Sequence, residues 1–285
     1  MDKKIILSAD SACDIGPDLK ERYQVNFFPF HILLDGKSYE DGVDISAEDI
    51  YAAYREKGIL PKTAGITPAE YADYFRRWVQ DGHEVIHINL GSALSSTHQN
   101  CKMAAEELGH VHVVDSASLS TGFGLLVVKG GEMIARGRPA GEIAAALAEG
   151  SARTNASFVL DTLEFMKAGG RCSAVAAFGA NLLQLKPSIR VNNHSGGSMG
   201  VSKKYRGSIE RVLPEYVRDQ LADRDDLDLD RIFITHSGSP ASDVELVRGE
   251  IAKYADFKEV IETRASATIS SHCGPRTLGV LFMNT

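Results

Sequence analysis

Short apolar segments alternate with helix-length segments through the first half of the chain, and this alternation limits the fold more than any other feature. Residues 5–9, 85–90 and 111–114 are rich in Ile, Val and Leu and are typical of strands. Residues 99–108 and 122–135 have the length and pattern of helices. Strands separated by helices of this length predict βαβ units and a mainly parallel sheet.

Two more helices in this half begin with capping signals. Ser46 stands three residues before Asp49, and Thr67 stands three residues before Glu70 with a proline between them. A hydroxyl followed three residues later by an acidic side chain is typical of a helix N-terminus. A further strand is expected over residues 27–34. The first half is therefore predicted to be a doubly wound α/β unit.

The second half has a different pattern of predicted strands, helices and turns. Residues 187–191 and 200–201, separated by the turn-rich segment 192–197, predict an antiparallel hairpin. The acidic segment 223–230 is expected to be a solvated surface linker. Further strands are expected at residues 158–160, 232–235, 260–263 and 278–282, and a helix at 209–221. We therefore divide the chain near residue 153, into a parallel α/β domain (1–153) and a mixed α/β domain (154–285).

Composition excludes several classes of protein. The chain carries 31 Lys and Arg against 38 Asp and Glu, a net charge of −7, and this sign argues against nucleic acid as a main partner. The four cysteines are scattered without a CxxC pair, as expected in a reducing compartment. No stretch approaches the ~18 apolar residues of a membrane span, and the first residues are too polar for a signal peptide. We expect a soluble cytoplasmic protein with no stable membrane insertion.

Clusters of hydroxyl and small side chains follow several predicted strands. They occupy residues 90–97, 115–122 and 235–239, each near the predicted start of a helix or the end of a strand. Ligands bind at the carboxyl ends of strands in open α/β sheets, where helix N-termini favour a small anion. The alternative is that these residues only cap helices. Their recurrence favours an anion site.

Catalytic and metal-binding patterns find little support. The chain has no G-x-S-x-G nucleophile elbow, no G-x-x-x-x-G-K-[ST] phosphate loop and no G-x-G-x-x-G fingerprint. His83 and His87 share one face of a predicted strand, but a third ligand is missing nearby, and the acidic segment 223–230 lacks the pattern of a calcium loop. We therefore expect a binding protein rather than an enzyme, with no metal and no cofactor.

Several motifs, in order along nearly the whole chain, resemble those of the DegV family. The first are the turn D-S-x-x-D at residues 10–14, the acidic loop 39–42 and the segment 62–68, followed by the serine-rich stretch 91–97 and D-S-x-x-x-S-x-G at 115–122. The more specific ones are L-E-x-x-x-x-G-G-R at 163–171, L-K-P at 185–187, R-G at 206–207 and S-H-C-G-P at 271–275. Order and spacing together make the resemblance specific.

The resemblance implies a function, because members of the family are fatty-acid carriers that present the acid to a separate kinase that makes acyl phosphate. The carboxyl group would lie between the two domains, with Thr63, Ser92, Ser95 and His272 as anchors. The acyl chain would run into an apolar tunnel in the second domain, for which Phe165, Met166, Phe178, Leu182 and Leu185 are candidates. Arg171 and Arg206 would contact the kinase, and a role of these arginines in capping a helix or pairing with Glu210 stays open.

The sequence departs from the family pattern at five positions. Ala64 and Ile66 replace a serine and a proline beside Thr63; Gly91, Ser96 and Arg276 replace a serine, a glycine and a glycine. The loss of two hydroxyls leaves the anion site with fewer hydrogen-bond donors. Arg276 either adds a charge near the carboxylate or faces solvent. Two other hypotheses therefore stay open: a small-molecule kinase-like enzyme related to dihydroxyacetone kinase, with His272 or His236 as base or anchor, and a carrier of a different amphiphile.

Overall fold

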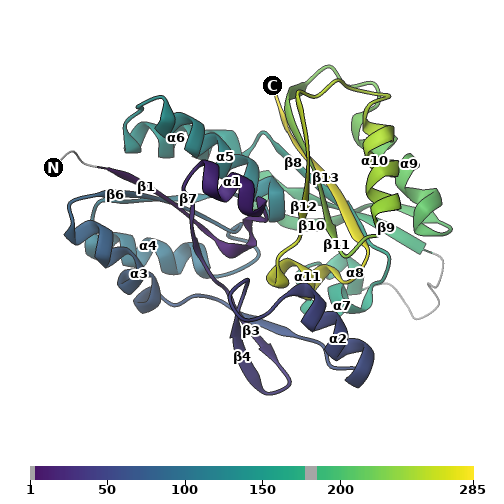
Figure 1. Ribbon diagram of the computed structural model, residues 1–285, viewed down its shortest axis with the longest axis horizontal. Coiled ribbons are helices and arrows are strands. Elements are labelled where there is room, and N and C mark those ends of the chain that lie inside the picture. Colours follow the sequence, from purple (N-terminus) through teal and green to yellow (C-terminus); the bar gives the residue numbers. More distant parts are fainter. Residues whose placement is uncertain (1–3, 177–184) are drawn as a thin grey trace.

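Two large β-sheets lie side by side, with a small third sheet below them (Figure 1). The computed structural model describes residues 4–176 and 185–285. None of the helices in these residues is long and apolar enough to cross a membrane.

The first sheet is parallel throughout, as the sequence predicts. Its strand order is β2 (Asn26–Phe28), β1 (Ile5–Asp10), β6 (Glu84–Asn89) and β7 (Val111–Asp115). Helices α3 (Pro68–Gln80) and α4 (Thr97–Leu108) cover one face, and α1 (Gly16–Arg22), α5 (Ser120–Ala135) and α6 (Ala140–Ser151) cover the other (Figure 1). The doubly wound first domain is confirmed. α6 follows the predicted helix directly and was not predicted.

Both capping signals mark real helix starts. The side chain of Ser46 accepts a hydrogen bond from the Asp49 N–H at the start of α2 (Ala47–Lys57), and Asp49 in turn accepts one from the Ser46 N–H. Thr67 and Glu70 form the same reciprocal pair at the start of α3. These bonds satisfy N–H groups that have no partner inside the helix.

The strand predicted over residues 27–34 is wrong as a single element. The chain breaks at Pro29 and Phe30 and continues as β3 (His31–Leu34), which belongs to the small antiparallel sheet β4-β3-β5 with β4 (Lys37–Glu40) and β5 (Lys62–Ala64). Proline has no N–H for a strand ladder, and the Phe30 N–H donates to the Ser11 side chain at 3.1 Å instead. The break therefore moves the chain from one sheet to another.

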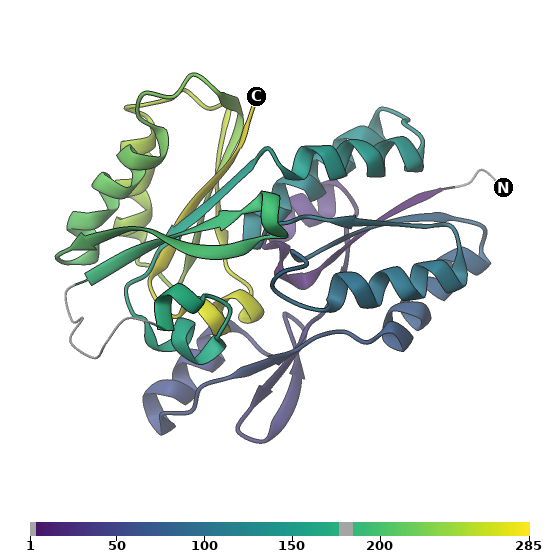
Figure 2. The same cartoon turned by 180° about the vertical axis from the view of Figure 1, so that it is seen from behind.

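The second sheet is mixed, also as predicted. Its order is β10 (Ser198–Arg206), β9 (Leu185–Asn192), β8 (Thr154–Val159), β13 (Thr277–Asn284), β11 (Leu227–Ser237) and β12 (Glu259–Arg264), and only β11 and β12 pair in parallel. Strands β9 and β10 form the predicted hairpin around a short 3-10 turn, η2 (Asn193–Ser195). Helices α9 (Ile209–Leu221) and α10 (Ala241–Ile251) lie on its outer face (Figure 2).

The acidic segment 223–230 is only partly a linker, which corrects the prediction. β11 begins at Leu227, which pairs with Asn284 of β13, so the last part of the segment is strand. Alternation of Leu and Asp at residues 227–230 gives this part the period of a strand, in spite of its charge.

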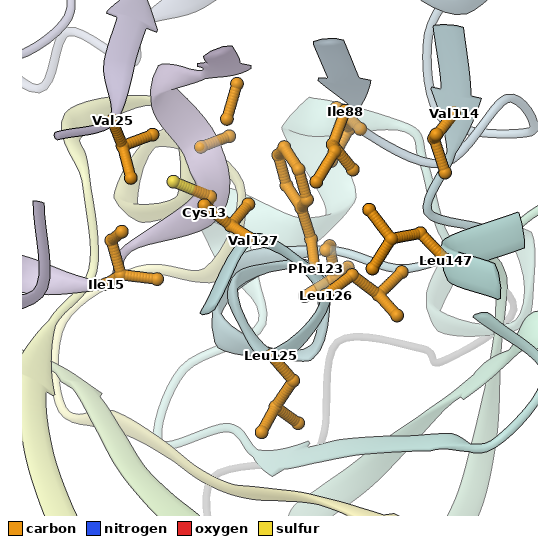
Figure 3. Packing of buried hydrophobic residues seen from close by; sticks show 14 of the residues in the cluster. Cys13, Ile15, Val25, Ile88, Val114, Phe123, Leu125, Leu126, Val127 and Leu147 are labelled. Carbon is orange, nitrogen blue, oxygen red and sulfur yellow. The ribbon is translucent and has the colours of Figure 1, made fainter. Parts of the chain in front are cut away.

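Helix α5 lies between the two large sheets and is buried on almost all sides (Figure 3). Phe123 and Leu126 pack among the apolar side chains of the parallel sheet, and Gly122 lies so close to the second sheet that an added Cβ would come within 2.8 Å of Ala156. A helix that is apolar all round is typical of such a buried position. One hydrophobic core includes residues from both sides of residue 153, so the division there stays a proposal about chain organisation.

The last helix, α11 (Ala267–Cys273), belongs to the second half in sequence but packs on elements of the first. It contacts α2 and the 3-10 turn η1 (Ser11–Cys13) as well as α7 (Glu164–Gly169). In Figure 1 it lies above α2 and beside α7 and the short α8 (Ser173–Ala176). α11 thus places residues from the end of the chain next to residues from its beginning.

Candidate functional site

Two small cavities adjoin each other where α11 meets the two halves of the molecule. One, here called the Thr63 cavity, measures about 60 Å³; the other, the Phe158 cavity, measures about 50 Å³. Both are lined by Leu119, Met199, Ile269 and His272. The shared walls make them adjacent compartments of one site.

The Thr63 cavity is the polar compartment. Thr63 on β5, Ser95 in the loop before α4, Arg171 after α7 and His272 near the end of α11 line it together. The Thr63 hydroxyl and His272 Nε2 are 2.9 Å apart and share a hydrogen bond. Two hydroxyls, an imidazole and a guanidinium are groups that hold a carboxylate by several hydrogen bonds.

His272 is a neutral imidazole near physiological pH. Burial, together with the nearby charge of Arg171, lowers its pKa to about 4. Its Nδ1 atom is buried and has no hydrogen-bond partner among the described residues. A bound anion would favour the protonated ring, so the site couples anion binding to the charge of this side chain.

Gly169, the last residue of α7, is the position that lets His272 sit where it does. A Cβ added at Gly169 would lie 2.2 Å from His272 Nδ1, far inside van der Waals contact. The next residue, Gly170, caps α7 in the left-handed conformation with φ +67°. The two glycines of the L-E-x-x-x-x-G-G-R motif therefore have separate roles: one makes room for an imidazole and the other ends a helix.

The Phe158 cavity is the apolar compartment. Its large apolar lining residues come from β8, β10, β13, α7, α11 and the loop before α5 and are Leu119, Phe158, Met166, Met199, Ile269 and Leu281. Two hydroxyl groups in its wall have partners outside the wall, since Thr235 bonds Thr263 at 3.0 Å and Ser237 bonds Ser270 at 2.7 Å. These paired hydroxyls leave a wall suited to a hydrocarbon.

The structure brings some of the predicted site residues together and separates others. Thr63, Ser95 and His272 line the polar compartment, and Met166 lines the apolar one. Ser92 is exposed, its N–H donates to Asp115 Oδ1 at 3.1 Å, and it lines neither cavity.

The remaining tunnel candidates lie elsewhere. Phe165 is fully buried in edge-to-face contact with Tyr51 and Tyr54, in the core between α2 and α7. Leu185 begins β9 and lines neither cavity. Phe178 and Leu182 lie outside the described residues. Adjacent residues on α7 point to different sides of the helix, which separates Met166 from Phe165.

Arg171 and Arg206 differ in their surroundings, which the sequence alone left open. Arg171 is exposed, donates to the Gly169 carbonyl at 2.8 Å and lines the Thr63 cavity, so it caps α7 and also faces the site. Arg206 is exposed at the end of β10. Glu210, its expected alternative partner, bonds Arg276 at 2.6 Å instead.

Neither expectation for Arg276 holds. Its guanidinium bridges Glu210 on α9 and the buried Asp243 on α10, at 2.6 and 2.8 Å, and it lines neither cavity. The backbone of Arg276 has φ +56°, in the left-handed region where glycine is favoured. This conformation is consistent with a glycine as the usual residue at the position.

Three other departures from the family pattern have distinct local surroundings. Gly91 lies against the β9–β10 turn, where an added Cβ would be 2.6 Å from the Gly196 carbonyl oxygen. Ile66 is fully buried in the main core. Ala64 lines the Thr63 cavity, and because it has no hydroxyl it offers a ligand no side-chain hydrogen-bond donor there.

Several site residues were not predicted from the sequence. Met199 lies on β10 of the predicted hairpin, and Ile269 precedes His272 by three residues on α11. Residues three positions apart on a helix lie on the same face, so the spacing from Ile269 to His272 could have predicted Ile269 as a site residue. Among residues 4–176 and 185–285 no three His, Cys, Asp or Glu side chains gather as a metal site would require. His87 lies 3.1 Å from Asp10 in a buried network.

An α/β protein with a parallel and a mixed sheet, and with a cavity carrying polar groups beside an apolar cavity, is the class that the fold and the site define. A protein-family model described as "Uncharacterised protein, DegV family COG1307" matches residues 4–285. The chain belongs to the DegV family. A DegV domain-containing protein of Caldanaerobacter subterraneus is 30% identical over 285 residues, which cover 98% of this chain and 99% of that protein.

Solved structures of the family are closely similar. A DegV family protein from Thermus thermophilus, described by its fatty acid binding, superposes with a TM-score of 0.87 at 29% identity over 99% of this chain and 100% of that chain. A stearic acid-binding protein from Eubacterium ventriosum has a TM-score of 0.81 at 22% identity, over 99% and 98% of the two chains. The second comparison shows likeness of fold.

Replacement of Gly169 by alanine tests the packing of α7 against His272. The new Cβ leaves no room for the imidazole, so we expect the His272 ring to move and its 2.9 Å contact with Thr63 to be lost. A crystal structure of the variant measures that distance. Gly249→Ala, on α10 where an added Cβ meets nothing within 4 Å, is the matched control. An unchanged Thr63–His272 contact in Gly169→Ala would contradict this account.

Proposed function

We propose that this protein is a non-catalytic carrier that binds a long-chain fatty acid and presents it to a partner kinase for acyl-phosphate formation. The carboxylate lies in the Thr63 cavity, and the acyl chain extends into the Phe158 cavity. One observation carries the proposal: the cavity lined by hydroxyl, imidazole and guanidinium groups adjoins an apolar cavity and shares four lining residues with it.

The chemistry of the two compartments supports an amphiphilic acid. Each methylene moved from water into an apolar cavity contributes about 0.8 kcal/mol, so the tail supplies most of the affinity. Thr63, Ser95, Arg171 and His272 then fix the orientation through hydrogen bonds. The fatty acid binding described for the Thermus relative, at 29% identity over almost the whole chain, supports the same ligand class.

The kinase-like alternative has less support. His236 lines the Phe158 cavity, but its Nδ1 accepts the Ser239 N–H at 3.1 Å and its Nε2 lies 3.3 Å from Glu262. Both ring nitrogens are therefore engaged by the protein itself. His272 keeps a free Nδ1, but it faces Gly169 rather than a group that would activate it as a base.

The identity of the ligand separates the three hypotheses. We expect organic extraction of the purified protein, followed by mass spectrometry, to release a long-chain fatty acid in about equimolar amount. A different amphiphile would support the other carrier hypothesis. The extraction of a small phosphorylated metabolite, with fatty acids failing to bind on addition, would contradict the fatty-acid assignment.

Removal of the anchoring hydroxyls should weaken binding in proportion to the hydrogen bonds lost. Thr63→Val and Ser95→Ala are each expected to cost about 1–3 kcal/mol of binding free energy, because a buried carboxylate loses a donor. Titration with a fluorescent or isotope-labelled fatty acid measures the change. Ser38→Ala, on the exposed strand β4, is the control. Ser92→Ala tests the exposed loop hydroxyl, and its position predicts little change. Unchanged affinity in the Thr63→Val/Ser95→Ala double variant would refute the assignment.

The partner surface is tested by the two arginines separately. Arg206 lies outside both cavities, so Arg206→Ala should leave fatty-acid binding intact and lower acyl-phosphate formation with a cognate kinase by about tenfold. Arg171 lines the Thr63 cavity, so Arg171→Ala should lower both. Arg55→Ala, on the exposed face of α2, is the control. Full kinase turnover with Arg206→Ala would exclude that side chain from the interface.

A further inference from the structure

Two buried carboxylates from the first half of the chain meet the first turn of α11. Asp14 Oδ1 accepts the Ser266 N–H at 2.9 Å, and Asp41 Oδ1 accepts the Ala267 N–H at 2.9 Å. Asp14 and Asp41 are 5% and 3% exposed. Both belong to segments that resemble family motifs, the D-S-x-x-D turn and the acidic loop, and neither is explained by the two cavities.

The first N–H groups of a helix have no partner inside that helix and carry its partial positive charge. In α11 the Ala267 N–H is buried and the Ser266 and Ile269 N–H groups are partly buried, so they need acceptors from elsewhere. Ser266 supplies one acceptor itself, through its side chain to the Ile269 N–H, and the two aspartates supply the others. The helix that carries His272 is thus anchored to a part of the chain more than two hundred residues away.

The second oxygen of each carboxylate is also held. Ser120 donates to Asp14 Oδ2 at 2.6 Å, and Ser11 donates to Asp41 Oδ2 at 2.8 Å. Ser11 in turn accepts the N–H of Phe30, immediately before β3. The aspartates are therefore fixed in orientation by α5, η1 and the beginning of β3.

Burial raises the pKa of both carboxyl groups, that of Asp14 to about 7. A carboxylate in such a place costs free energy, which bonds to the backbone of α11 offset. Thr63 lies on β5, which pairs with β3 in the small sheet, and Ile32 of β3 lies opposite Thr63. Asp41 directly follows β4 of this small sheet, whereas Asp14 follows η1, after β1 of the parallel sheet.

We propose that Asp14 and Asp41 are positioning residues for the headgroup site: they fix the N-terminus of α11 so that His272, near its other end, faces Thr63 across the cavity. The nature of the ligand in this inference rests on the proposed function. The placement of α11 and His272 does not. Without the two carboxylates, α11 has no buried acceptors for Ser266 and Ala267, and the imidazole loses its fixed place opposite the hydroxyl.

The test compares two double variants and reads His272 directly. In the ligand-free Asp14→Ala/Asp41→Ala variant, we expect NMR titration of the His272 imidazole to show its pKa rising from about 4 toward the ordinary value, because the helix leaves its buried position. Fatty-acid affinity should fall by at least about tenfold. Asp14→Asn/Asp41→Asn keeps an amide oxygen for each backbone N–H and should retain both properties.

A destabilised control separates positioning from general loss of stability. Ser157→Ala removes buried hydrogen bonds to Tyr216 and Gln220 on the outer face of the second sheet and should leave the pKa of His272 and the affinity unchanged. If the alanine double variant does not fold, Asp14→Ala and Asp41→Ala are measured singly, with a smaller rise in the pKa expected in each. A folded variant without either carboxylate that keeps the low pKa of His272 would overturn the proposal. Failure of the wild-type protein to bind fatty acids would refute the proposed function alone, because the His272 titration needs no ligand.

Discussion

The hydrogen bonds that the Ser266 and Ala267 N–H groups, at the start of α11, donate to Asp14 and Asp41 are the interaction on which the site depends. They attach a helix from the end of the chain to the turn and loop near its beginning. This attachment helps to hold Thr63 and His272, 209 positions apart in sequence, within hydrogen-bond distance. The Phe158 cavity then lies between α11, the second sheet and the start of α5.

The Phe158 cavity and the Thr63 cavity offer a ligand different contacts because their polar groups differ in whether the protein already pairs them. In the Phe158 cavity the hydroxyls of Thr235 and Ser237 are satisfied by neighbouring hydroxyls, so this wall offers a ligand mainly apolar contacts. In the Thr63 cavity His272 Nε2 faces the Thr63 hydroxyl at 2.9 Å, and Arg171 lends positive charge. An amphiphilic acid matches both compartments at once, which neither a purely polar metabolite nor a neutral hydrocarbon does.

Much of the fold was predictable because its signals are local. Capping boxes at Ser46 and Thr67 and the apolar runs of the parallel sheet required no knowledge of distant residues. The break at Pro29 was missed because the Phe30 N–H bonds a side chain of another segment. For the site, motifs identified Thr63, Ser95 and His272, but spacing could not show that Ser92 turns to solvent or that Phe165 packs against Tyr51. Those outcomes depend on tertiary contacts that single motifs do not encode.

A crystal structure of the protein with a bound saturated long-chain fatty acid tests the central claim most directly. The account predicts a carboxylate oxygen at about 2.6–3.2 Å from the Thr63 hydroxyl and from His272 Nε2. The acyl chain should pass Met199 and Ile269 and end near Phe158 and Leu281. A carboxylate at the Phe158 end, or a ligand bound away from α11, would contradict the account.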